Sequence, residues 1–565
     1  DWGYRGEGHH GKWEDYVAEW RRRLELVGRE NLRMFVSPPG AFVGHPHPDY
    51  RVATAETLAK HMQAFGDHPA FAGFEFDEIH FGNCWCRICM PMFHEYLKKR
   101  FAREELLALG VIKAKDDAAQ KMVDAARKKE SLDQQFETIL NDTPAADSPP
   151  PVKEKVDVKA EEIDQIGGPT ANERGANPAL YTIRMEWRAQ VFEESAKAAF
   201  DHVHELRPDA LVHTLLSPAN FADFTGRDWG GPFGAPLYRM AAMSDIITID
   251  PYWNGVPEEA YWCDLMRAHA KGPALLTVGT HYDARTPDSL ERDLSIPFAH
   301  ADGMYIFDWV SCFKQSPYNQ NAVFNELWCP SGKWDRVWSV AMKAKKIAPY
   351  IVRTEPPRAL AMLHSMRSQA LEQHKGDLAG VDPGPGALAL PGLYNMRQMG
   401  LYSLFRQACI QPDPVYAEGL TVKQLGRYRV LYIQSAVSMT PEEEEMIRSW
   451  VRDGGHLIVT ASTTIKDRWG RDRKDYGLAD VFGVSYAGKR TLEKTNLTTQ
   501  PEMTYSGALD VVRPTSGKTV IAWPDGSPAV VENQFGKGRC VFVTARDLGL
   551  NYTSAHAGPE RACFN

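Results

Sequence analysis

The sequence has no apolar run of about 20 residues, the length that crosses a bilayer, so no membrane span is expected. It also lacks an excess of positive charge. Asp and Glu number 73 against 65 Lys and Arg, and the formal net charge of the 565 residues is -8. Such a chain is not drawn as a whole to phosphate backbones, so nucleic acid is not an expected partner.

A disulfide framework is also missing, because the nine Cys are odd in number and mostly far apart. The chain opens with Asp1-Trp2-Gly3-Tyr4, without an initiator Met or a signal peptide. This opening indicates a processed or truncated start. The compartment therefore stays open between the cytoplasm and export with loss of a signal peptide.

The length of the chain is too great for one hydrophobic core, so two or three domains are expected. Its 43% hydrophobic, 24% charged and 11% aromatic residues are typical of a soluble globular protein. The 15 Trp and 21 Tyr would suit a sugar-binding cleft. Large barrels also bury many aromatic residues, so composition does not decide between these uses.

Alternating helices and strands are predicted through the first two-thirds of the chain. Each expected strand is a short apolar run that stops at polar or aromatic residues, as parallel strands buried in an α/β-barrel do. The strands are predicted at 32–36, 71–76, 211–216, 245–249, 274–278 and 304–307. A barrel has eight strands. The missing ones should precede the first helix (13–27), with Asp1 to Gly6 as the tail of the second strand.

Domain 1–355 is thus predicted to be a TIM barrel of the (β/α)8 type that lacks its N-terminal strand or strands. Within it, 102–178 is Lys- and Glu-rich with few large apolar residues, which predicts a flexible charged insert that buries little surface. From 356 to 565 the pattern changes. A strand at 428–433, a helix that begins at Thr440-Pro441 and a strand at 456–460 predict a doubly wound α/β domain.

Two adjacent carboxylates, Asp77 and Glu78, follow the strand 71–76. In a barrel this strand end lies on the catalytic face. Repulsion between the two, with partial burial, would raise one pKa and leave a general acid, which glycoside cleavage requires. An exposed acidic loop explains the same two residues equally well.

The run Phe74–Cys89 resembles the fourth-strand region of family 42 β-galactosidases, in which an Asn-Glu pair precedes a C-x-C-x-x-C motif. The resemblance implies that Glu78 is the acid/base and that Asp77 replaces the Asn that holds the sugar's 2-hydroxyl. A second group of similar barrels, the α-fucosidase-like hydrolases, has an Asp nucleophile at this strand end. Asp77 matches that role too.

The second carboxylate is less defined, because the family has a nucleophilic Glu at the seventh strand end. Here that region, 275–283, contains no Glu, and Asp283 is the nearest carboxylate. The residues Asp250-Pro251-Tyr252 match the family's Asp-x-Tyr pattern of the sixth strand, which lines the sugar pocket. The expected substrate-binding residues are Asp250, Tyr252, Trp253, His281, Asp308 and Trp309, although the aromatic ones could equally cap the barrel core.

Cys84, Cys86 and Cys89 have the spacing of a thiolate cluster, and several family members bind a structural zinc with it. A tetrahedral site needs a fourth ligand. No Cys precedes Cys84 here, so His45 or His47 would complete the site. Three free thiols are the alternative, and no organic cofactor is expected.

The C-terminal domain resembles the trimerisation domain of the same family, which is flavodoxin-like and similar to class I glutamine amidotransferases. The motifs are 425–433, the helix that ends at Gly454-Gly455, 477–484 and 527–539. No Cys follows the strand at Gln434-Ser435-Ala436, so the domain is interpreted as structural. The resemblance implies a homo-oligomer, with a trimer favoured.

The leading interpretation is a glycoside hydrolase for galactoside-like or related sugars. Glu78 is its acid/base, and Asp77 or Asp283 is a non-standard nucleophile. Two alternatives stay open. One is a catalytically silent, carbohydrate-binding barrel, because the expected Glu is missing. The other is an assembly protein that uses its C-terminal domain, in which the strand-end acids would be idle.

Overall fold

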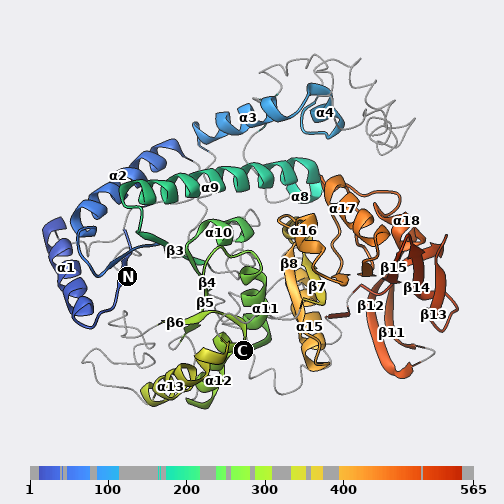
Figure 1. Cartoon of the computed structure of the whole chain (residues 1–565). Coiled ribbons are helices and arrows are strands. Elements are labelled where there is room, and N and C mark those ends of the chain that lie inside the picture. The colour runs from blue at the N-terminus through green and yellow to red at the C-terminus, as the bar shows by residue number, and fades with distance from the viewer. Residues whose placement is uncertain are drawn as a thin grey trace.

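The protein is described by a computed structural model in which two sheets lie next to each other, each flanked by helices (Figure 1). The structure describes residues 12–38, 41, 47–76, 86–113, 163, 166, 173–216, 237–249, 256–279, 287–307, 333–351, 358–372, 393–497, 500–546 and 548–549. None of the helices in these ranges combines the length and the apolar character that crossing a membrane requires.

The first sheet has six parallel strands in chain order. They are β1 (Met34–Val36), β2 (Phe71–Phe76), β3 (Leu211–Leu216), β4 (Ile246–Ile249), β5 (Ala274–Gly279) and β6 (Gly303–Phe307). Helices alternate with them: α1 (Trp13–Arg29), α2 (Pro48–Phe65), α9 (Pro178–Leu206), α10 (Leu237–Met243), α11 (Val256–Arg267), α12 (Pro287–His300) and α13 (Trp334–Ile351). This alternation confirms the six predicted strands and their barrel-type order.

A glycine permits the close approach of β2 and β3. Gly73 has φ +148°, and a Cβ placed on it would lie 1.9 Å from the carbonyl oxygen of Leu211. Only glycine combines this backbone conformation with this contact. The pairing of β1 with β2 also slips by one residue at this point, where Phe35 is opposite Gly73. The bulge fixes which side chains of β2 face the concave side of the sheet.

Apolar side chains near both ends of the predicted insert 102–178 are buried, and the flexible nature of the insert stays a prediction. α3 (Cys89–Arg100) leads into α4 (Arg103–Ala108), and α8 (Glu173–Ala176) precedes α9. Apolar side chains there form a separate core cluster with α9 and with Trp469 of the C-terminal half; among them are Leu106, Leu107, Val111, Ile112, Ile163 and Ile166. Leu106, Leu107, Val111 and Ile112 lie in one short apolar run, whereas Ile163 and Ile166 stand in charged sequence.

The second sheet is mixed, with the strand order β13-β14-β15-β10-β9-β7-β8. Its strands are β7 (Leu360–His364), β8 (Pro412–Tyr416), β9 (Val430–Ile433), β10 (His456–Thr460), β13 (Lys518–Ala522), β14 (Pro528–Phe535) and β15 (Gly538–Val543). The first four strands of this half run β8-β7-β9-β10 and are parallel, which is the flavodoxin-like order. This agrees with the predicted doubly wound domain.

In the described residues of this half, five helices and one hairpin accompany the sheet. The helices are α14 (Met366–Glu372), α15 (Leu393–Gln407), α16 (Val422–Leu425), α17 (Pro441–Arg452) and α18 (Ala479–Phe482). α17 starts where the sequence predicts, because the Thr440 hydroxyl accepts from the backbone N–H of Glu443 and the Glu443 carboxylate accepts from that of Thr440. β11 (Val484–Leu497) and β12 (Gln500–Pro514) form the antiparallel hairpin beside the sheet.

The hydrophobic core of the barrel continues into the C-terminal half, which also has a core cluster of its own. α11 of the barrel packs against β8 and α15, and Tyr261, Tyr402, Tyr416 and Tyr432 are buried in the same cluster as the barrel strands. Hydrogen bonds cross the junction as well: the hydroxyl of Tyr261 is 2.7 Å from Nδ1 of His364. Burial lowers the pKa of His364 to about 4, so this ring is neutral and donates through Nε2 to Gln369. The boundary at 355/356 stays a prediction.

Candidate active site

The carboxyl ends of the six barrel strands meet at one edge of the sheet, because all the strands run parallel. Candidate residues follow several of these strands directly in the sequence. Asp77 comes after Phe76 of β2, Asp250 after Ile249 of β4, and Asp308 after Phe307 of β6. Ligand and catalytic groups gather at this edge in barrels of this type. The strands that precede these candidate residues in the sequence therefore end at one edge of the sheet.

Most of the predicted site residues themselves lie outside the described residues. They are Asp77, Glu78, Cys84, Asp250, Tyr252, Trp253, His281, Asp283, Asp308 and Trp309. The predictions for the acid/base, for the second carboxylate and for the sugar-binding residues therefore stay predictions.

A layer of polar side chains lies on the inner face of the barrel, just before this edge. Nδ1 of His213 on β3 is 2.8 Å from Oε2 of Glu75 on β2. The hydroxyl of Tyr305 on β6 donates to Oε1 of Glu75 at 3.3 Å. On the other side of the His213 ring, Nε2 is 2.6 Å from Oγ1 of Thr248 on β4. The ring of Phe35 on β1 packs against His213, with 5.1 Å between the centroids.

The alternation of side chains along β2 explains why a carboxylate faces inward here. Phe74 and Phe76 point to the outer face, where Phe76 packs on Phe200 of α9, with 5.5 Å between the ring centroids. Glu75 between them faces the opposite side. Its side chain is 19% exposed, whereas that of His213 is 3% exposed. The carboxylate is therefore held by partners yet retains some access from the barrel interior.

This polar layer was not predicted from the sequence. Glu75 and His213 each stand alone in an otherwise apolar strand, so the runs 71–76 and 211–216 were interpreted by their apolar residues alone. The signal was present, because a lone Glu or His in a strand buried on both faces needs a buried partner. The layer places a carboxylate, an imidazole and a phenol hydroxyl side by side on the inner face of the barrel. It also fixes the strand that leads into Asp77.

Two of the three proposed zinc ligands are described. Cys86 is half-buried just before α3, and Cys89 is buried at its first residue. His47, one of the two candidates for a fourth ligand, is the N-cap of α2, where its Nδ1 accepts from the backbone N–H of Asp49 at 3.2 Å. Within the described ranges, no group of three or more metal-binding side chains is found.

The corresponding edge of the second sheet is filled by its own side chains. After β9, Gln434 and Ser435 are fully buried, and Ser435 has φ +49°. Its hydroxyl contacts Oγ1 of Thr460 at 3.2 Å. After β8, the Glu418 carboxylate accepts from the backbone N–H of Met366 and Arg367 at the start of α14. These contacts stabilise backbone ends, which agrees with a structural domain.

Comparisons with known proteins support the fold of both halves. Residues 360–554 match the family model of the β-galactosidase trimerisation domain. No curated protein sequence matches the chain. A catalytic mutant of a family 42 β-galactosidase from G. stearothermophilus has a similar structure at 17% identity, with 96% of this chain and 80% of that chain covered and a TM-score of 0.71.

Two further solved structures give the same result. A β-galactosidase from the Antarctic haloarchaeon Halorubrum lacusprofundi is 16% identical, with 95% of this chain and 81% of that chain covered and a TM-score of 0.70. A β-galactosidase from Bacillus circulans sp. alkalophilus is 14% identical, with 97% of this chain and 81% of that chain covered and a TM-score of 0.69.

The chain is therefore an α/β protein with a TIM-type barrel half and a flavodoxin-like half. In fold it is similar to family 42 β-galactosidases over nearly its whole length, and its C-terminal half matches their trimerisation domain.

Proposed function

We propose that this protein is a glycoside hydrolase for galactosides or related sugars, and that it uses two carboxylates with Glu78 as the acid/base. One observation carries the proposal: the partly accessible polar layer of Glu75, His213 and Tyr305 lies inside the barrel, directly before the strand end that leads into Asp77 and Glu78. A barrel that served only as scaffold would be expected to fill this layer with branched apolar residues.

In the proposed mechanism Glu78 protonates the leaving oxygen and Asp77 or Asp283 is the second carboxylate. The adjacent negative charge of Asp77 would raise the pKa of Glu78 and keep it protonated until the bond breaks. Asp250, Tyr252, Trp253, His281, Asp308 and Trp309 would bind the sugar. The separation of the two carboxyl groups would decide between retention and inversion.

The direct test is a screen of aryl glycosides that covers galactosides, fucosides, mannosides and glucosides in both anomeric forms. We expect turnover of one sugar class well above that of a heat-treated sample. Uniform inactivity, with the protein shown to be folded by circular dichroism, would reject catalysis.

A catalytically silent sugar-binding barrel is the second candidate, favoured by the lack of a Glu in 275–283. It predicts binding without turnover. Equilibrium binding of the same sugars to the protein distinguishes it from the hydrolase, because an enzyme would convert the glycoside that it binds.

We also propose one structural zinc per chain, held by Cys84, Cys86 and Cys89. The C-x-C-x-x-C spacing at the start of a helix and the burial of Cys89 support it. Elemental analysis of protein purified without added metal should find about one zinc per chain. The same measurement on Cys89→Ser should show a loss of zinc, and a metal-free wild type would reject the site.

For assembly we propose a homo-oligomer, most simply a trimer, supported by the match of 360–554 to a trimerisation domain. Light scattering on the intact protein gives the mass directly. A mass of one chain, 63.5 kDa, at micromolar concentration would overturn this proposal.

A further inference from the structure

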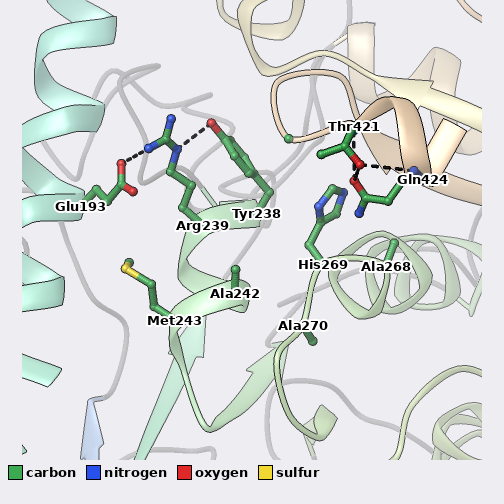
Figure 2. A pocket seen from close by; sticks show the side chains of 11 residues that line it. Glu193, Tyr238, Arg239, Ala242, Met243, Ala268, His269, Ala270, Thr421 and Gln424 are labelled. Carbon is green, nitrogen blue, oxygen red and sulfur yellow. Dashed lines mark hydrogen bonds and ion pairs between the residues drawn. The ribbon is translucent and has the colours of Figure 1, made fainter. Parts of the chain in front are cut away.

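Apart from the candidate active site, a pocket lies on the outer flank of the barrel, where the barrel meets the C-terminal half (Figure 2). Its volume is about 600 Å³, and it is lined by residues of α9, α10 and the end of α11 together with Gly419, Thr421 and Gln424. α10 and α11 lead into the amino ends of β4 and β5. The pocket is therefore separate from the carboxyl edge of the barrel. Its size falls within the range of about 300–1,000 Å³ that is usual for ligand sites.

The charges of this pocket cancel. Figure 2 shows Arg239 between Glu193 and Tyr238. The guanidinium of Arg239 pairs with the Glu193 carboxylate and also donates through Nε to the Tyr238 hydroxyl at 2.9 Å. The guanidinium would repel a cationic ligand and the carboxylate would repel an anionic one, so a neutral ligand is favoured.

One hydrogen-bond donor on the wall is fixed by the backbone. The N–H of Tyr416 donates to Nε2 of His269 at 3.0 Å. Burial lowers the pKa of His269 to about 4, so at neutral pH the single ring proton is on Nδ1. The described part of the chain provides no acceptor for this proton, although His269 lines the pocket.

Other polar groups are oriented in the same way. Oε1 of Gln424 accepts from the backbone N–H and the hydroxyl of Thr421, at 3.0 Å and 2.9 Å. These two bonds hold the amide, so its NH₂ group is directed away from Thr421. The Tyr238 hydroxyl accepts from Arg239 and keeps its own proton to donate. Ala242, Met243 and the Tyr238 ring provide apolar surface between these groups.

We infer that this pocket is a second sugar site, which binds one neutral pyranoside unit between the barrel and the C-terminal half. Donors and acceptors alternate with an aromatic ring and apolar patches, and the two charged groups neutralise each other. A sugar ring combines hydroxyls that donate and accept with apolar C–H faces, so it matches each part of this lining. The site needs no catalytic group and goes beyond the proposed hydrolysis.

The experiment counts bound sugars. Methyl thioglycosides of galactose, glucose and mannose resist hydrolysis, and their stoichiometry on the intact protein is measured by equilibrium dialysis. Ala242 is an exposed residue of the lining, so Ala242→Trp should fill the pocket without disturbing the core. Ala198→Trp, at an exposed position of α9 outside the lining, is the matched control.

We expect Ala242→Trp to bind one sugar fewer per chain than wild type and Ala198→Trp to bind as wild type does. Unchanged stoichiometry in Ala242→Trp, or loss of the same sugar in both variants, would overturn the inference. The result does not depend on turnover. If the proposed hydrolysis fails, the loss of one sugar in Ala242→Trp still supports the second site. If turnover is found but the stoichiometry of Ala242→Trp is unchanged, only the second site is rejected.

Discussion

Both sheets have an edge at which the carboxyl ends of parallel strands meet, but the side chains at the two edges have different partners. In the barrel, the last inward positions hold Glu75, His213 and Tyr305, and the Glu75 carboxylate is still partly exposed. In the second sheet, the equivalent edge places Ser435 and Glu418 on backbone and hydroxyl partners, and Ser435 is fully buried.

This difference sets the barrel edge, where we propose the chemistry, apart from the half for which we propose a role in assembly. Parallel strands bring side chains together at their carboxyl ends in both halves. Glu418 is partly exposed, as Glu75 is, so the two edges differ in their partners and not in exposure. Where the partners are side chains on the inner face of a barrel, the charge of the carboxylate can act on a ligand. Where every partner is a backbone end or an internal hydroxyl, the same convergence only stabilises turns. Removing side chains should thus affect rate at the first edge and stability in the second half.

The largest effect is expected at the barrel edge. Glu78→Gln keeps the size of the side chain but removes the proton that the leaving group needs. We expect the hydrolysis of unactivated glycosides to fall by roughly 10²–10⁴-fold. Steady-state kinetics and thermal unfolding should be measured together, with Gln434→Ala as the matched change at the second edge. A folded Glu78→Gln protein with normal turnover would remove Glu78 from the mechanism.

The second half should respond through stability. Arg367 is buried and pairs with Glu443 at 3.1 Å and with Glu186 at 3.7 Å. Arg367→Met leaves Glu443 without this cation, while Glu186 keeps its pair with Arg468 at 3.5 Å. Breaking a buried pair in this way costs about 3–5 kcal/mol. Urea unfolding measures the loss.

Arg448→Met is the control, because Arg448 pairs with the half-exposed Glu445 and Asp480 and its loss should cost about 1 kcal/mol or less. Equal losses in the two variants would contradict the importance of burial.

A pH dependence should accompany Glu444 of α17. Burial raises the pKa of this carboxyl to about 7, against the attraction of Arg473 at 2.6 Å. The folded state therefore holds this proton more tightly than the unfolded state. Its contribution to stability is present below about pH 4.5 and is lost as the pH rises through 7.

Glu444→Gln should flatten the pH dependence of the unfolding free energy between pH 4.5 and 7, by at most about 3.5 kcal/mol, since one pKa unit corresponds to about 1.4 kcal/mol. The adjacent Glu445, whose pKa is lowered by hydrogen bonds to Arg448 and Ser449 despite some burial, provides the comparison as Glu445→Gln. If both variants keep the wild-type slope, the proton is not on Glu444.

The smallest effect is expected from Tyr305→Phe, which removes the hydroxyl that donates to Glu75. One hydrogen bond contributes about 1 kcal/mol, so stability should fall only slightly. The catalytic rate should change more than the KM, since Glu75 would lose one of the groups that position it. Tyr350→Phe, at a side chain that is 81% exposed, is the control and should change neither quantity.

The sequence predicted the strands well because each is a compact apolar run. β2 and β10 begin and end where expected. The polar layer could not be predicted in the same way, because Glu75 and His213 become partners only when two strands that are far apart in the chain lie in register. The contact of α11 with the second sheet is equally non-local. The buried ends of the predicted insert were missed because the short apolar run 106–112 was interpreted together with the charged sequence that follows it.

Because part of the core is shared, the C-terminal half depends on the barrel for the burial of its own side chains. Tyr402 and Tyr416 belong to the C-terminal half, yet their burial depends on α11 of the barrel. A fragment cut between the halves would expose these rings to water. The C-terminal half is thus not a cassette that recombination or protein engineering can move alone. To be grafted onto another enzyme, it would have to carry α11 or acquire a replacement surface on its new host.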